Sequence, residues 1–141
     1  MSLASWMDEF YPVSANDASA TKTELAALRH SLHKWKGLRR KNLEKHRLHK
    51  VYGMAMIQQG SHEIMPIDSD SCALCERMFF MSDDCRGCPL ARSFQRRSHK
   101  SKTHTPCNYN HAYVKWCDTG NPEPMIRALE RAIEDLREGR I

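Results

Sequence analysis

The sequence predicts a small, mainly α domain with a zinc-knuckle lobe, an irregular α(+β) fold stapled by one structural zinc ion. Three observations support this fold class. Two Cys-x-x-Cys pairs lie near the middle of the chain, and residues 22–36 and 122–138 each carry an apolar stripe at helical spacing. The 141 residues are 40% hydrophobic, with 3 Trp, 4 Tyr and 4 Phe. A core this lean favours a metal staple.

The length of the chain suits one domain with an additional arm. We expect an N-terminal arm at residues 1–20 and a single zinc-stapled domain at residues 21–141. That domain has three expected parts, which are a basic helical region at 21–58, a zinc lobe with a basic loop at 64–117, and a C-terminal helix at 122–138. No apolar run approaches the ~20 residues of a membrane span, and no secretory segment begins the sequence. We therefore expect a soluble, intracellular protein without a membrane partner.

The predicted zinc ligands are the four knuckle cysteines, Cys72, Cys75, Cys85 and Cys88. Two C-x2-C pairs present four thiolates from two tight turns, which is what a closed tetrahedral Zn²⁺ site requires. Four sulfur ligands leave no open position, so the zinc is expected to be structural. The alternatives are two chance pairs of buried, reduced cysteines, or disulfides. Disulfides are disfavoured because intracellular thiols are kept reduced.

Positive charge is concentrated in two blocks. Residues 22–50 contain ten Lys or Arg against two acids, and residues 86–102 contain six Lys or Arg and no acid, within a net charge of +5. Such an uneven distribution of charge along the chain favours a polyanionic partner. The alternative explanation is that the charges only solvate a helix face and keep a loop soluble. The residues expected to contact nucleic acid are Arg39, Arg40, Lys41, Arg47, Arg92, Arg96, Arg97, Lys100 and Lys102.

The N-terminal arm carries Trp6, Phe10 and Tyr11, which should dock on the domain, because exposed aromatic clusters are uncommon; the alternative is a short docking peptide for a partner. The region that follows the arm is expected to be helical. Thr21 and Glu24 have the spacing of a capping box at the start of the first helix.

A further helix through about residue 58 is expected from the register of Leu48, Tyr52 and Ala55. Four histidines in this region are interpreted as basic surface residues, because two histidines at i,i+3 spacing do not make a closed site. They are His30, His33, His46 and His49.

The zinc lobe contains the apolar run 78–81, an expected core filler, and ends in a polar segment, 92–106, that is expected to be a surface loop. Because the arginines of such a loop lie on the surface, their replacement should change stability little. The last helix begins near Pro122, buries Leu129 and stops near Gly139.

The sequence leaves open whether the segment that follows the loop supplies further metal ligands. His104, Cys107 and His111 lie close in sequence, and the pair His104-x2-Cys107 has ligand spacing. A second zinc there, replacement of one knuckle cysteine by Cys107, and a buried Cys107 among decorating histidines are the three alternatives. We favour the last.

Several motifs together resemble a family of small zinc-knuckle proteins of tailed bacteriophages, with the pattern C-x-x-C followed by C-x-G-C-P. The motifs are Phe10-Tyr-Pro12, Leu28-Arg-His-Ser-Leu-His-Lys-Trp35, Cys72-Ala-Leu-Cys75, Cys85-Arg-Gly-Cys88-Pro-Leu, Cys107, Tyr113 and Trp116. The resemblance covers residues 10–136. It implies a phage or prophage origin and the cytoplasm of a host bacterial cell, and it implies no established activity.

Three functions are compatible with these patterns. The favoured one is a non-catalytic zinc module that binds nucleic acid or a nucleoprotein through the two basic blocks. The second is a protein-binding effector that inhibits or redirects a host bacterial enzyme. The third is a metal-dependent nuclease using His99, His104, Asn108 or His111. It is disfavoured because that loop contains no acid to bind Mg²⁺ and the chain has no Gly-rich phosphate-binding loop.

Overall fold

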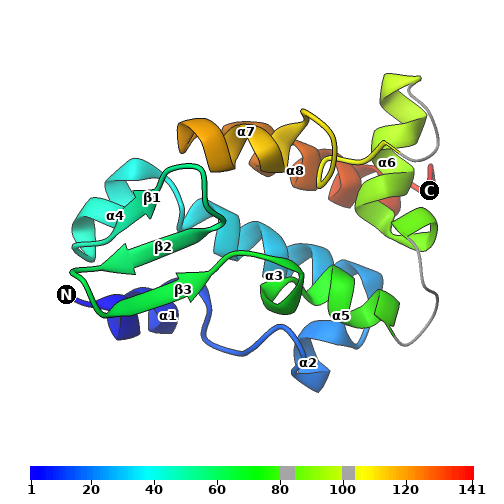
Figure 1. The fold of residues 1–141 in the computed structure, drawn as a ribbon. Helices are drawn as coiled ribbons and strands as arrows, with labels where there is room; N and C mark the ends of the chain where they lie inside the picture. The colour runs from blue at the N-terminus through cyan, green and yellow to red at the C-terminus, as the bar shows by residue number, and fades with distance from the viewer. Residues whose placement is uncertain (80–84, 100–103) are drawn as a thin grey trace.

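Helix α3 (Glu24–Lys36) lies at the centre of the molecule, and the other elements pack around it (Figure 1). The computed structural model describes residues 1–79, 85–99 and 104–141. The other helices are α1 (Leu3–Phe10), α2 (Ala18–Thr21), α4 (Arg40–Lys45), α5 (Ala73–Phe79), α6 (Pro89–Ser98), α7 (Ala112–Thr119) and α8 (Glu123–Arg137). Two 3-10 turns are η1 (Ser69–Ser71) and η2 (Cys85–Gly87). The small, mainly α domain that the sequence predicts is confirmed.

The two amphipathic helices are also confirmed, as α3 and α8, and they pack on each other. Trp35 is 4% exposed and Leu129 is fully buried. The expected capping box is wrong by two residues, because Thr23 caps α3 by accepting a hydrogen bond from the Ala26 amide at 3.0 Å. Thr21 instead ends α2, where its hydroxyl donates to the Asp17 carbonyl. Helix α8 ends before Gly139, which has a φ of 72°.

The N-terminal aromatic residues dock on the domain, as expected. Trp6 is fully buried in α1, and its indole Nε1 donates to the Gly37 carbonyl at 2.8 Å. Gly37 is required by this packing, since a Cβ at that position would lie 2.4 Å from Cγ of Phe10. Helix α1 is thereby held against the C-terminal end of α3.

One of the four histidines departs from the expected surface role. His46 is only 2% exposed, with Nδ1 2.7 Å from the Ser5 hydroxyl and Nε2 2.7 Å from a Glu9 carboxylate oxygen. Both partners belong to α1, and His46 directly follows α4. The prediction of a surface histidine is wrong at this position, because the ring joins two helices.

The predicted helix through residue 58 is wrong, because residues 49–66 form a three-stranded antiparallel sheet. Its strands are β1 (His49–Val51), β2 (Met56–Gln59) and β3 (Glu63–Pro66), in the order β1-β2-β3. Gly53 and Gly60 make the connecting turns possible, with φ of 76° and 59°, in the left-handed region that favours glycine. Lys50, Ile57 and Met65 are paired across the strands and form the buried face.

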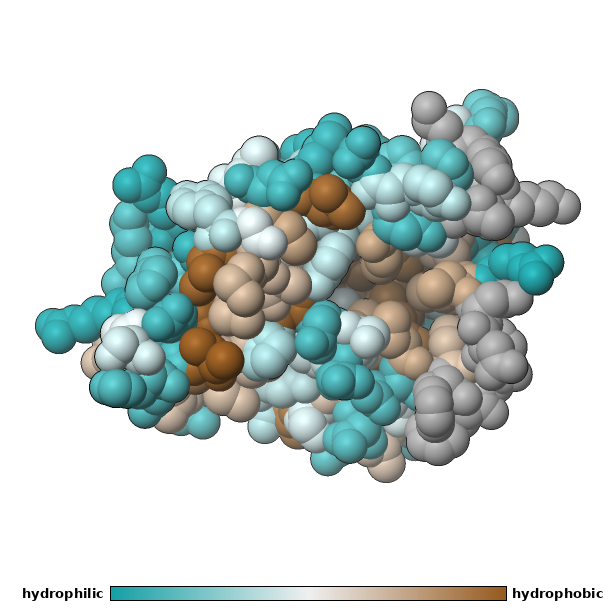
Figure 2. All heavy atoms as spheres, in the orientation of Figure 1, coloured by the Kyte–Doolittle hydropathy of each residue, from teal (hydrophilic) through white to brown (hydrophobic). Residues whose placement is uncertain are grey.

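The opposite face of the sheet is open and partly apolar. Ile64 on this face is 49% exposed and in register with the polar Gln58 and His49, and Met54 in the adjoining turn is 50% exposed. Val51, Met56 and Pro66 are aligned across the three strands on the same side. Figure 2 shows the corresponding brown and tan cluster over the sheet. No helix of the described residues is long and apolar enough to cross a membrane.

Helix α6 occupies the first part of the segment that was expected to be a loop. The loop prediction is wrong there because α6 packs on α8 through a buried carboxylate. Asp135 of α8 has a side-chain exposure of 0% and accepts hydrogen bonds from Ser93 at 2.7 Å and from Arg97 at 2.7 and 2.9 Å. Arg140 donates to the same carboxylate at 2.9 Å. In the apolar run 78–81, Met78 lies in α5 and residues 80 and 81 lie outside the described residues.

Replacing Asp135 with Ala should therefore destabilise the protein by about 3 kcal/mol, because it removes the shared partner of Ser93 and Arg97. Arg97, with Ser93 and Arg140, holds the pKa of Asp135 well below its usual range. The ionised Asp135 carboxylate therefore stabilises the folded protein at a pH above the unfolded-state pKa, and this contribution to the free energy of unfolding is lost as pH falls below about 4. Chemical denaturation of both proteins at several pH values measures the difference.

The matched control is Glu134→Ala, which removes a neighbouring carboxylate that is 56% exposed and also pairs with Arg140. It should change the free energy of unfolding by no more than about 0.5 kcal/mol. Equal effects of the two replacements would contradict the special role of Asp135.

Candidate metal centre and basic groove

The five cysteines from 72 to 107 come from three segments that meet beside α3. Cys72 immediately precedes α5 and Cys75 lies in its first turn. Cys85 lies in η2, and Cys88 is the N-cap residue of α6. Cys107 lies between α6 and α7. All six cysteines of the chain are free of disulfide bonds.

A hollow of about 330 Å³ is lined by Cys72, Cys75 and Cys107. Figure 2 shows the surface hollowed in this region, between α5 and α6. The charge of Cys72 acts on both Cys88 and Cys107, and so does the charge of Cys85. Cys72, Cys75 and Cys107 thus line one hollow, and Cys85 and Cys88 lie near enough for electrostatic interaction with them; these five residues are called the thiol cluster below.

The thiol groups of the cluster differ in acidity. The Cys75 thiol donates to the Cys72 sulfur, which lowers the pKa of Cys72 well below its ordinary value and raises that of Cys75. Burial raises the pKa of Cys88 to about 12. Cys107 is an exposed residue, but burial of its sulfur among the surrounding atoms raises its pKa. Cys72 is thus the thiol in the cluster that most readily carries negative charge.

Lys34 of α3 lies against this cluster and is almost completely buried, with 1% exposure. Its ammonium donates to the Ser71 carbonyl at 2.7 Å and also contacts the Ser71 hydroxyl at 3.4 Å. Burial lowers the pKa of Lys34, and negative charge on Cys72 and Cys75 opposes this shift. Among the described residues no carboxylate lies within ion-pair distance of its ammonium. A buried ammonium needs a negative partner, and Cys72, whose pKa is lowered, is a group of this site that can supply one.

The histidines that follow the basic loop form a separate group. Nδ1 of His104 lies 3.1 Å from Nε2 of His111, and the ring of His104 stacks on Tyr109. His99 is exposed and ends α6, and Asn108 accepts a hydrogen bond from the Thr105 amide within a turn. Within the described residues, no three His, Cys, Asp or Glu side chains are arranged so as to hold a metal ion as they stand.

A groove of about 690 Å³ runs between α4, β1 and the connection from α7 to α8. It is lined by basic residues, by Tyr52 and by two acids. The lining residues with charged or aromatic side chains are Arg39, Arg40, Lys41, Glu44, His49, Lys50, Tyr52 and Glu123. Arg39 pairs with Glu123 at 2.7 Å, and Arg40 pairs with Glu44 at 2.8 Å across an exposed helix turn. Lys41 is exposed and forms no ion pair among the described residues.

Arg47 and the second basic block lie outside this groove. Arg47 is exposed just after α4, with a φ of 59°. Arg92 pairs with Glu24 at 2.6 Å, whereas Arg96 and Arg97 contact Asp135. Lys100 and Lys102 lie outside the described residues. The arginines of α6 thus hold the fold together, in contrast to the surface role expected for them.

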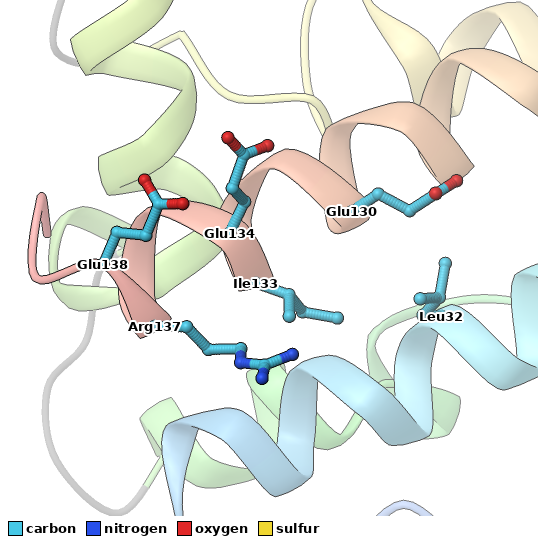
Figure 3. A pocket seen from close by; sticks show the side chains of 6 residues that line it. All are labelled: Leu32, Glu130, Ile133, Glu134, Arg137 and Glu138. Carbon is cyan, nitrogen blue, oxygen red and sulfur yellow. The ribbon is translucent and has the colours of Figure 1, made fainter.

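A further groove, of about 470 Å³, lies between α3 and α8 (Figure 3). Leu32 and Ile133 point into the space between the two helices. Two of the glutamates at its edge, Glu134 and Glu138, pair with Arg140. We interpret this groove as the solvent-facing edge of the helix packing.

Sequence reasoning missed Lys34 and Tyr52. Lys34 was counted as part of a basic surface, although it follows Ala27 and Ser31 by seven and three residues and so shares their buried helical face. Tyr52 was assigned to a helical register with Leu48 and Ala55, but it lies in the turn after β1 and is 69% exposed. The following Gly53 is the signal that would have indicated the turn.

Comparisons of the chain with protein-family models, with curated proteins and with solved structures returned no match. The resemblance to the phage zinc-knuckle family therefore stays a prediction from the motifs.

Replacing Lys34 with Met should lower the free energy of unfolding by about 1–3 kcal/mol, because it leaves the Ser71 carbonyl without its donor and the thiol cluster without its cation. Lys36→Met on the same helix removes an equal charge at a half-buried position and should cost no more than about 0.5 kcal/mol. Denaturant titration of the two variants measures the contrast. A loss no larger for Lys34 than for Lys36 would refute the role of its ammonium.

Proposed function

We propose that this protein is a non-catalytic module that binds nucleic acid through the groove between α4 and β1, with a structural Zn²⁺ in the thiol cluster. The observation that carries the binding function is the groove itself, in which the exposed cations Arg40 and Lys41 of α4 lie beside an exposed aromatic ring. Phosphates bind lysine and arginine by releasing condensed counterions.

The zinc proposal is supported by the donor set and by Lys34. Sulfur donors from two Cys-x-x-Cys pairs are the ligands that structural zinc prefers. A tetrathiolate zinc centre carries two negative charges, whereas two disulfides carry none. A buried ammonium beside the cysteines is stabilised by the former, whereas the latter leave it without a charged partner. Cys72, Cys75, Cys85 and Cys88 would hold the ion, and Cys107 is the alternative donor.

The exposure and weak pairing of its cations support the groove as the binding surface. Arg40 is 92% exposed, and its pair with Glu44 is an exposed i,i+4 contact of a kind that contributes little to stability. A phosphate group can therefore replace Glu44 as its partner. Lys41 is exposed on the next position of α4. By contrast, the arginines of α6 would have to leave Asp135 and Glu24 to bind a polyanion.

A second candidate function is a protein-binding effector that acts on a host bacterial enzyme. The open sheet face favours it, because Met54 and Ile64 are half-exposed beside an apolar row across three strands. Replacing Ile64 with Lys would distinguish the two functions, since it disrupts an apolar interface and adds a cation that nucleic acid tolerates.

Elemental analysis of purified protein should find one zinc ion per chain. Cys75→Ser and Cys88→Ser should each abolish stoichiometric binding, and Cys117→Ser, which changes a half-buried cysteine of α7, should leave it intact. Removing zinc with a chelator should lower the melting temperature, because metal-binding free energy is folding free energy.

Soluble, folded protein without zinc would contradict the metal proposal. A stoichiometry near two would instead assign a second ion to the group of His104, Cys107 and His111, in which ring nitrogens of the two histidines lie 3.1 Å apart. If Cys107→Ser loses zinc and Cys85→Ser keeps it, Cys107 is the fourth ligand.

The double replacement Arg40→Ser and Lys41→Ser should weaken nucleic-acid binding and make its salt dependence shallower. Each lost phosphate contact changes the slope of log K against log[salt] by about 0.9 on duplex and about 0.7 on single strands. Arg131→Ser with Arg137→Ser removes the same charge from exposed positions of α8 and serves as control. Fluorescence anisotropy over a salt series measures both. Equal losses in the two double variants would show a diffuse charge effect instead of a groove.

A further inference from the structure

Tyr52 is a large aromatic side chain that the fold leaves in the open, with 69% exposure, on the turn between β1 and β2. It lines the basic groove together with Arg39, Arg40 and Lys41. An exposed aromatic ring beside cations is the combination by which proteins bind unpaired bases, because each base stacks on the ring while its phosphates meet the charges.

The ring is held in place from one side. The Lys50 ammonium lies 5.7 Å from its centroid, and Lys50 itself donates to the carbonyls of Val51, Met54 and Cys117. Gly120, with a φ of 76°, approaches the ring from the connection between α7 and α8, and a Cβ there would lie 3.3 Å from Cε1 of Tyr52. A glycine at this position thus lets the ring rest against the backbone.

This support positions the ring without covering it. Lys50 is fixed by three carbonyl groups from two parts of the chain, so the turn that carries Tyr52 is fixed as well. A base that stacks on the exposed side loses little conformational entropy from the protein, because the platform is already ordered. Double-stranded nucleic acid keeps its bases stacked inside the helix and offers this ring only its backbone.

We propose that the groove selects single-stranded nucleic acid, with one unpaired base stacked on Tyr52 and the adjoining phosphates on Arg40 and Lys41. This inference rests on the proposed nucleic-acid function and names its substrate class. RNA and single-stranded DNA share the chemistry that the ring recognises, which is an accessible base on a charged backbone.

The test compares the wild type with Tyr52→Ala, Tyr52→Phe and Tyr109→Ala. Tyr109 is a matched control, because it is also exposed, at 54%, but stacks on His104 away from the groove. Fluorescence anisotropy at about 50 mM salt measures the affinity of each protein for a mixed-sequence DNA strand of about twelve nucleotides, for the same sequence in RNA, and for its duplex.

The wild type should bind the single strands more tightly than the duplex. Tyr52→Ala should weaken single-strand binding by roughly 5- to 150-fold, the range expected for the loss of one base stack. Tyr52→Phe should retain the affinity, and Tyr109→Ala should not change it. The slope of the salt dependence should be the same for Tyr52→Ala as for the wild type, because no phosphate contact is lost. A strand carrying the fluorescent base 2-aminopurine should be quenched by the wild type and not by Tyr52→Ala.

Two results would overturn the selection of single strands while leaving the nucleic-acid function in place. They are duplex binding as tight as single-strand binding, and unchanged single-strand binding by Tyr52→Ala. A loss in Tyr109→Ala as large as that in Tyr52→Ala would also overturn it, since the groove would then not be the stacking site. Failure of the wild type to bind any of the three nucleic acids would instead refute the proposed function itself.

Discussion

The fold depends on polar and ionisable side chains that are buried and hydrogen-bonded. A lean apolar core leaves junctions between elements that hydrophobic packing alone does not hold, and in this protein hydrogen bonds from these side chains hold them. Lys34 joins α3 to the start of the thiol cluster through the Ser71 carbonyl, and Lys50 joins the β1 turn to α7 through the Cys117 carbonyl. Asp135 joins α8 to α6, and His46 joins α4 to α1. Each of these groups is costly to bury alone. Their partners come from distant parts of the sequence, so each junction forms only when the whole fold is in place.

The parts of the fold that could be predicted are those with a strong local period. Helices α3 and α8 carry apolar stripes that admit one interpretation, and the two ends of α8 are marked by Pro122 and Gly139. The sheet was missed because Leu48 and Tyr52 have helical spacing by chance, while its real determinants are two glycine turns and short strands. Helix α6 was missed because its arginines look like a solvated loop. What makes it a helix in this fold is Asp135, 38 residues from Arg97, and no local pattern reports such a contact.

The same limit applies to the candidate sites. Cysteine spacing predicts four thiols that converge, because a tight turn fixes the distance within each pair. It says nothing of Cys107, which reaches the cluster only through the path of the chain between α6 and α7. The charge of a lysine likewise says nothing of its burial. Lys34 and Lys41 belong to one basic block, yet the first lies inside the domain against sulfur and the second lies on its surface. The net charge of a sequence segment therefore overestimates the charge that is exposed on the surface to a binding partner.

Helix α7 connects the thiol cluster to the groove. It begins five residues after Cys107, and its Tyr113 hydroxyl donates to the Ile67 carbonyl at 2.6 Å, ahead of the first cysteine pair. One turn further along α7, the centroid of the Trp116 ring lies 5.2 Å from that of the Trp35 ring. The Lys50 ammonium lies over the Trp116 ring, 4.6 Å from its centroid. The Cys117 carbonyl at the same level accepts hydrogen bonds from Lys50 and from the Gly53 amide, which flank Tyr52. The position of Tyr52 is thus set by contacts with a helix whose other end lies beside the hollow that Cys72, Cys75 and Cys107 line. The zinc ion that we propose for the cluster would have no contact with the groove, and it would act on the aromatic ring only through α7.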